Sequence, residues 1–264
     1  MKTIKKQPKN SHMIYQPLPF IVGTFAITWV CTGCMSKTDY HAHTILFTFL
    51  DFMENASPLF CTLILLRPYW SKNSFPRRFF LGKPIGRYAY PVVFFFFAAQ
   101  FLNFYLFRVK GTSFSLPAFM ITFMGQFLLG GGLEEAGWRG YLLPCFYQKY
   151  PILLSSASVS IIWVFWHLPY FLIPGSVQAG GNFLSYSIIG IVTGFLLTAI
   201  YLLTKSVLLC MLFHSWQNTI VMTVQADQSD FRFMLIFLFL GVLSILLCLN
   251  IQKKECISNL TSST

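Results

Sequence analysis

Two adjacent glutamates and an arginine lie inside one long apolar stretch of the sequence, where charged residues are unexpected. The stretch reads GQFLLGGGLEEAGWRGYLLP and contains Glu134, Glu135 and Arg139 after three consecutive glycines. Glu135 and Arg139 are four positions apart, the spacing at which side chains of a helix form an ion pair. Glu134 is rotated by about 100° from Glu135 on such a helix and is free for another role, such as acid–base chemistry. A buried structural ion pair, with Glu134 only hydrogen-bonded, is the alternative that this stretch leaves open.

Two further apolar stretches each carry a histidine with a partner four positions away. In IIWVFWHLPYF the partner of His167 is Trp163, and in LLCMLFHSWQNTI the partner of His214 is Asn218. Residues at this spacing project from the same face of a helix. An imidazole and a carboxamide on one face can donate two hydrogen bonds to a single oxygen, as stabilisation of an oxyanion requires. The alternative is that these polar side chains only hold neighbouring helices together.

An acidic pair lies in an apolar stretch nearer the N-terminus. Asp51 and Glu54 are three positions apart, with Asn55 beside them and Pro58 soon after. Acids rarely face lipid, so both are expected to face the interior of a helical bundle. They either form a polar lining or helix contact, or belong to a substrate cavity and set its specificity.

The composition indicates that membrane-spanning helices carry all these residues. Of the 264 residues, 55% are hydrophobic and 10% are charged, and 30 are phenylalanines. The mean hydropathy is +0.62. Soluble proteins have about 25% charged residues, so a soluble domain, a disordered chain and a coiled coil are excluded. The lipid bilayer is therefore the expected surrounding of most of the chain.

Eight apolar stretches are long enough to cross a bilayer, which takes about 20 residues. They are 18–35, 44–66, 90–107, 117–143, 153–173, 184–204, 206–224 and 231–250. We therefore predict an all-α polytopic membrane protein, a single bundle of about eight transmembrane helices over residues 18–250. Residues 1–17 and 251–264 are expected to be tails.

The net charge of +11 is explained by membrane topology rather than by nucleic acid. With the N-terminus in the cytosol, most of the 19 lysines and arginines fall in cytosolic segments, as the positive-inside rule expects. The sequence has no nucleic-acid-binding motif and no basic patch interleaved with aromatic residues. Both termini are therefore predicted to be cytosolic, and no nucleic-acid partner is expected.

The motif residues of three predicted helices lie at one depth in the membrane. Counting about 1.5 Å per residue from the cytosolic ends of the predicted spans places Glu134, His167 and His214 in the cytosolic half of the bilayer. A carboxylate, an imidazole and an imidazole with an amide would then share one level.

Together the three motifs resemble those of the CPBP intramembrane proteases, the relatives of the type II CAAX prenyl endopeptidase and of bacteriocin-immunity proteins. The motifs are Glu134-Glu135-x-x-x-Arg139, an aromatic-x-x-x-His ending at His167, and His214-x-x-x-Asn218. Trp163 occupies the place of the usual phenylalanine and preserves a large aromatic side chain. The resemblance covers about residues 117–224, which would form the catalytic core, and implies a multi-pass protein of the cell membrane.

The resemblance also implies a hydrolytic mechanism. Glu134 would be the general base that activates water, and His167 would help to hold that water. His214 and Asn218 would donate hydrogen bonds to the oxyanion of the tetrahedral intermediate. The supporting residues would be Glu135, Arg139 and Trp163.

A zinc-dependent mechanism is a competing hypothesis. Two histidines and a glutamate could bind zinc and leave one position open. The H-E-x-x-H signature is absent from the sequence, however, and the pairing of His214 with Asn218 suits an oxyanion better than a cation. We therefore expect neither a metal nor another cofactor.

The predicted function is an intramembrane endopeptidase that acts on a peptide or a membrane protein. A non-enzymatic immunity or scaffold protein, which binds a peptide or a receptor through the same cavity, is the alternative. A proton-coupled transporter would also use buried acids and histidines, but the sequence shows no inverted repeat. The compact chain with short loops resembles the bacterial branch of the family, whose implied substrates include secreted signalling peptides and bacteriocins.

Overall fold

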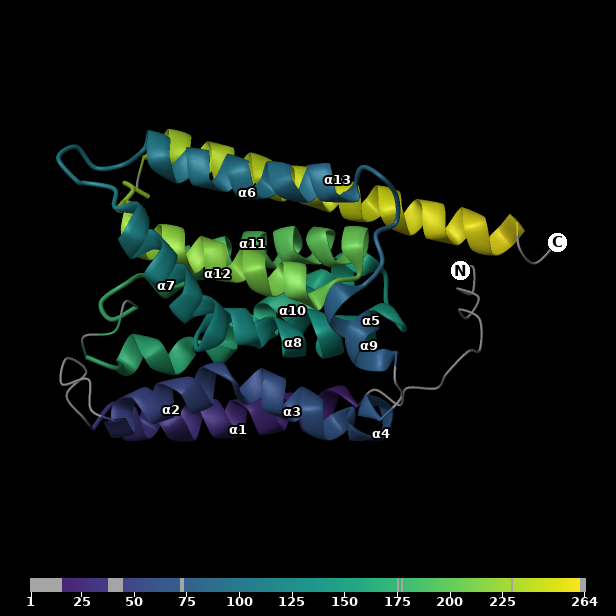
Figure 1. The fold of residues 1–264 in the computed structure, drawn as a ribbon, viewed down its shortest axis with the longest axis horizontal. Coiled ribbons are helices and arrows are strands. Elements are labelled where there is room, and N and C mark those ends of the chain that lie inside the picture. Colours follow the sequence, from purple (N-terminus) through teal and green to yellow (C-terminus); the bar gives the residue numbers. More distant parts are fainter. Residues whose placement is uncertain are drawn as a thin grey trace.

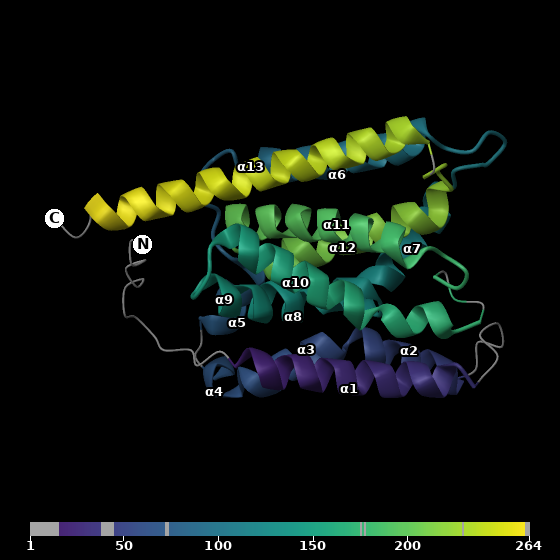
Figure 2. The ribbon, with the colours of Figure 1, turned by 180° about the vertical axis from the view of Figure 1, so that it is seen from behind.

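The computed structural model describes residues 16–37, 45–71, 74–174, 176, 178–228 and 230–261. Over these ranges the chain consists of helices and their connections, with one isolated β-bridge between Arg108 and Ala226. The helices lie along a common direction in three layers (Figures 1 and 2). The all-α fold class predicted from composition and hydropathy is confirmed.

Seven helical segments within the described ranges are long and apolar enough to cross a membrane. They are α1 (Pro17–Met35), α6 (Ala89–Leu106), the composite segment Leu116–Tyr147, the segment Ile152–Leu172, α11 (Phe183–Thr204), α12 (Val207–Val224) and most of α13 (Phe231–Thr261). Side-chain caps mark three of the starts, since Ser115 accepts a hydrogen bond at the beginning of the segment Leu116–Tyr147, Asn182 at the beginning of α11 and Ser206 at the beginning of α12. These segments agree with seven of the eight predicted spans.

The predicted span 44–66 is not one helix. It consists of α2 (Ile45–Asn55) and α3 (Ser57–Leu65), which follow one another alongside α1 (Figures 1 and 2). Pro58 has no N–H with which to bond the carbonyl of Glu54, so the helical ladder is interrupted there. The hydroxyl of Thr28 in α1 donates to that carbonyl instead, at 3.3 Å. The chain still crosses the bundle at this point, but as two short helices.

The predicted span 117–143 is helical but irregular. A regular helix, α7 (Leu116–Leu128), ends before the glycines. It is followed by the 3-10 turn η2 (Gly131–Glu134), the short α8 (Glu135–Gly137), the π-helical turn η3 (Trp138–Leu142) and α9 (Leu143–Tyr147). A side chain at Gly132 would collide with Ser215 of α12, so the glycine permits η2 to pack closely against α12.

The remaining elements join the layers at their ends. Two short helices, α4 (Arg67–Trp70) and α5 (Phe75–Leu81), connect α3 to α6. Within the segment Ile152–Leu172, α10 (Ile152–Trp166) continues into the 3-10 turn η4 (Leu168–Leu172). In Figure 1, α6 and α13 form one outer layer, α1 to α3 form the other, and the helices between them form the middle layer. This middle layer carries most of the residues singled out from the sequence.

The last helix is longer than predicted. α13 runs to Thr261, so residues 251–261 of the expected tail are helical. Glu255 of this extension accepts a hydrogen bond from Tyr147 at 2.7 Å and pairs with Lys205 at 3.2 Å. Lysine, glutamate and glutamine are good helix formers, so the helix continues after its apolar part ends. Residues 1–15 and 262–264 of the predicted tails lie outside the described residues.

Candidate active site

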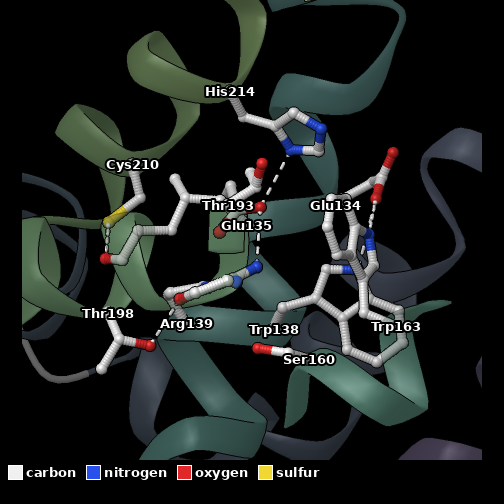
Figure 3. Close-up of polar contacts among 12 residues, drawn as sticks. Glu134, Glu135, Trp138, Arg139, Ser160, Trp163, Thr193, Thr198, Cys210 and His214 are labelled. Carbon is white, nitrogen blue, oxygen red and sulfur yellow. Dashed lines mark hydrogen bonds and ion pairs between the residues drawn. The ribbon is translucent and has the colours of Figure 1, made fainter. Parts of the chain in front are cut away.

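Glu134 ends the 3-10 turn η2 and is 2% exposed. Its Oε2 accepts a hydrogen bond from the indole of Trp163 at 2.6 Å and a longer one from the indole of Trp138 at 3.4 Å. Donated hydrogen bonds offset the free-energy cost of burying a carboxylate. The other oxygen, Oε1, points away from both indoles (Figure 3) and accepts no hydrogen bond within the described residues. One oxygen of Glu134 is thus fixed, and the other is available to a ligand.

Glu135 is fully buried and joins three elements. Its Oε1 accepts from Arg139 Nη1 at 3.1 Å and from His214 Nδ1 at 2.9 Å (Figure 3). Arg139 in turn donates to the backbone carbonyl of Gly194 in α11 at 3.3 Å. The ion pair predicted from the i,i+4 spacing of Glu135 and Arg139 is confirmed. Its contact with His214 connects α8 to α12 and fixes the orientation of the imidazole.

The contact between Glu135 and His214 determines which nitrogen of the imidazole faces the site. A carboxylate can only accept hydrogen bonds, so Nδ1 of His214 carries a proton. Nε2 is then the nitrogen that remains for other interactions. Four residues later, Asn218 Nδ2 donates to the side-chain oxygen of Gln126 in α7 at 3.0 Å, which holds the amide in place.

Glu134, His214 and Asn218 converge beside the backbone of Gly131. A methyl carbon added at Gly131 would lie 2.5 Å from Asn218 Nδ2, 3.0 Å from His214 Nε2 and 3.2 Å from Glu134 Oε1. An acceptor oxygen and two nitrogens from η2 and α12 therefore surround one small volume. Glycine is the residue that lets these three side chains come so close to its backbone.

His167 and Trp163 lie next to this convergence. His167 forms the C-terminal end of α10, and its Nδ1 donates to the backbone carbonyl of Trp163 at 2.9 Å. The Trp163 ring packs edge to face against His167, with 5.0 Å between ring centroids, and against His214, with 5.4 Å. Trp163 therefore contacts both histidines and Glu134. Its indole donates to Glu134, which a phenylalanine at this position could not do.

Asp51 and Glu54 approach the same region from α2. The helices α2 and α3 pack against η2, and Glu54 is close enough to Glu134 for their charges to interact. Glu54 is fully buried, whereas Asp51 is partly exposed. The structure thus brings the acidic pair near the other motif residues.

Residues 115–220 match a family model, described as type II CAAX prenyl endopeptidase Rce1-like. Over this range, the Rce1-like core, the chain is similar to that family. The matched range extends from just before α7 into α12, and it contains the three motifs from Glu134 to Asn218. The resemblance to CPBP intramembrane proteases is confirmed, and the seven apolar helices make the chain a multi-pass membrane protein. No curated protein matches the chain.

Two residues of the Rce1-like core extend the site beyond the motifs. Trp138, the second indole donor to Glu134, is four positions after it, so the spacing rule for helices also points to this contact. Gln126, which holds Asn218, is a polar side chain in a largely apolar helix, and such residues usually face a partner. The contact of Gln126 with Asn218 could not be read from the motifs alone, because it joins positions 92 apart in the sequence.

The Rce1-like core contains no recognisable metal centre within the described residues, since no three histidine, cysteine, aspartate or glutamate side chains are grouped closely enough to hold an ion. Two cavities lie elsewhere in the molecule. One of about 160 Å³ adjoins Tyr147, Lys205 and Glu255, and one of about 480 Å³ lies between α6 and α13. Neither cavity includes Glu134.

Proposed function

We propose that this chain is an intramembrane endopeptidase, which hydrolyses a peptide bond of a membrane-associated or peptide substrate. The observation that carries the proposal is the convergence of Glu134, His214 and Asn218 on the volume beside Gly131. A water molecule bound to Oε1 of Glu134 would face this volume. Glu134 would accept its proton as it attacks the peptide carbonyl, the role of a general base.

The same volume supplies donors for the negative charge that develops on the carbonyl oxygen. The amide of Asn218 has a second N–H besides the one donated to Gln126. His214 can donate from Nε2 only when both ring nitrogens carry protons, because Nδ1 already donates to Glu135. In that state Glu135 balances the charge of the imidazolium. Each preorganised donor of this kind contributes about 3–4 kcal/mol to transition-state stabilisation.

His167 has a supporting role in this proposal. Its Nδ1 proton is donated to the carbonyl of Trp163, so Nε2 of the neutral ring is an acceptor. This nitrogen would help to hold the water. Trp163, which touches both histidines and Glu134, would hold these three side chains in position.

The proposal is tested by comparing the membrane peptidomes of cells that produce the wild-type protein and Glu134→Gln. Glutamine keeps the shape of the side chain and an oxygen that accepts from Trp163, but it cannot act as the base. We expect specific cleavage products to disappear and their precursors to accumulate in the variant. Glu255→Gln serves as the control, because this acid lies at the end of α13 and should leave the peptidome unchanged. Identical peptidomes at equal protein levels would instead support a non-enzymatic immunity or scaffold function.

A further inference from the structure

The carboxyl group of Glu54 has no partner in the part of the chain that the structure describes. Its side chain is fully buried, and neither Oε1 nor Oε2 forms a hydrogen bond. Leaving a carboxyl group unsatisfied in an apolar interior costs several kcal/mol, so buried polar groups of native proteins are nearly always paired. Two empty acceptor atoms at one buried position leave room for a donor that the described residues do not supply.

The position of Glu54 relates this missing partner to the proposed active site. Its helix, α2, packs against η2, which ends in Glu134. The charges of Glu54 and Glu134 interact, and Tyr186 of α11 lies close enough to interact with both. The ring of Tyr186 also packs against His167, with 5.6 Å between centroids. Glu54 therefore lies near the volume at which the proposed cleavage takes place.

The charges around Glu54 indicate the sign of the partner. None of the ion pairs among the described residues includes Asp51, Glu54 or Glu134. The nearby cation Arg139 is paired with Glu135, and His214 donates to that same carboxylate. Asp51 and Glu54 thus face one region without a basic partner among the described residues, so a positively charged group would be favoured there and an anion disfavoured.

Asp51 supplies a route to the buried acid. It lies one helical turn before Glu54 on α2 and is partly exposed, so the two side chains lead from the surface into the bundle. A flexible chain that ends in a charge can place its apolar stem along such a path and its charged head at the acids. Lysine and arginine side chains have this form.

We propose that Glu54, assisted by Asp51, binds a lysine or arginine side chain of the peptide substrate beside the bond that is cleaved. The inference rests on the proposed function, because it specifies which substrate the protease would bind, namely a basic peptide. It assigns the acidic pair to substrate recognition and not to bond breaking.

The test measures binding separately from cleavage. The probes are eight-residue alanine–leucine peptides with blocked ends, in which a single lysine is moved through every position, and the same peptides with acetyl-lysine in its place. Binding is measured to full-length protein in lipid nanodiscs, with Glu134→Gln as the background so that no probe is consumed. We expect at least one lysine position to bind about tenfold more tightly than its acetylated counterpart, as a hydrogen bond to a charged group implies.

Variants of the acidic pair decide the outcome. Glu54→Gln removes a buried charge without changing shape and should abolish the preference for lysine, Asp51→Asn should reduce it, and Glu255→Gln should leave it intact. Equal binding of lysine and acetyl-lysine peptides at every position, or a lysine preference that survives in Glu54→Gln, would overturn the inference. Cleavage of the same probes by protein with Glu134 intact is scored separately. A lysine preference without any cleavage would count against the proposed protease and not against the cation site.

Discussion

At the scale of single residues, the two adjacent glutamates have different partners and therefore different expected mutant phenotypes. Glu135 is the carboxylate to which both Arg139 and His214 donate. Glu135→Gln should destabilise the protein by about 3–5 kcal/mol, because it leaves Arg139 as a buried charge without a counter-charge. Thermal unfolding in detergent measures this loss, with Glu134→Gln as the comparison. Equal melting temperatures for the two variants would contradict the assignment of the ion pair to Glu135.

Trp163 and Trp166 offer a matched pair for testing the indole contact to Glu134. Trp163→Phe keeps an aromatic ring but removes the 2.6 Å hydrogen bond to Glu134, and it should lower kcat/KM about tenfold or more. Trp166 is equally buried, but its indole N–H has no partner within the described residues. Trp166→Phe should therefore lower stability through lost packing, with a smaller effect on kcat/KM than Trp163→Phe. A similar fall in kcat/KM for both variants, at equal stability, would show that the hydrogen bond is irrelevant to turnover.

The residue scale also shows how far sequence spacing can predict a site. The Glu135–Arg139 pair follows from positions four apart on one helix, and the structure confirms it. The contact of Glu135 with His214 joins positions 79 apart in the sequence, so no spacing rule could find it. That contact determines what His214 can do in the site, because its Nδ1 proton is already donated to Glu135. Tertiary packing alone determines which nitrogen is left for the substrate.

At the scale of elements, the 3-10 turn η2 positions the site because Gly131 has no side chain. Gly131→Ala would place a carbon 2.5 Å from Asn218 Nδ2, which is too close for both groups to keep their positions. We expect a loss of about 10²-fold in kcat/KM with the fold intact, since small displacements of reacting groups have effects of this size. Steady-state cleavage assays measure the loss.

Gly125→Ala is the control for that substitution. Gly125 lies in α7, where an added carbon would meet nothing within 4 Å. Alanine there should leave activity unchanged and stabilise the helix by about 1 kcal/mol. Full activity of Gly131→Ala would mean that the volume beside this residue is not where the reaction occurs.

Most elements, but not the interruptions in them, could be predicted from hydropathy. The ends of α11 and α12 fall within about one residue of the predicted spans 184–204 and 206–224, because apolar length is set by the bilayer. Predicting the break between α2 and α3 would require knowing that Thr28 donates to the carbonyl of Glu54, which Pro58 leaves without a hydrogen bond. The turn η3 is π-helical where the spacing alone predicts α-helix. Such turns depend on neighbouring helices and often occur at functional sites.

At the scale of the whole molecule, the chain crosses the bundle eight times when α2 and α3 are taken together, so α1 begins and α13 ends at the same end (Figure 1). Two exposed cysteines report on the sides of the membrane: Cys34 in the last turn of α1 and Cys256 in the extension of α13. The other five are buried. With both termini cytosolic, a membrane-impermeant maleimide should label Cys34 in intact cells and Cys256 only after permeabilisation.

Single variants serve as controls for this topology. Cys34→Ser should lose the label obtained in intact cells, and Cys256→Ser should lose the label that permeabilisation adds. Labelling of Cys256 from outside intact cells would reverse the orientation inferred from the basic residues.

The measurement that tests the central claim most directly is cleavage of a peptide by purified protein that has been stripped with a strong chelator. If Glu134 activates water without a metal, the wild-type protein keeps its turnover after chelation, whereas Glu134→Gln falls to background at unchanged melting temperature. Activity that disappears with chelation and returns with stoichiometric zinc would contradict the account, and so would turnover by Glu134→Gln at the wild-type rate.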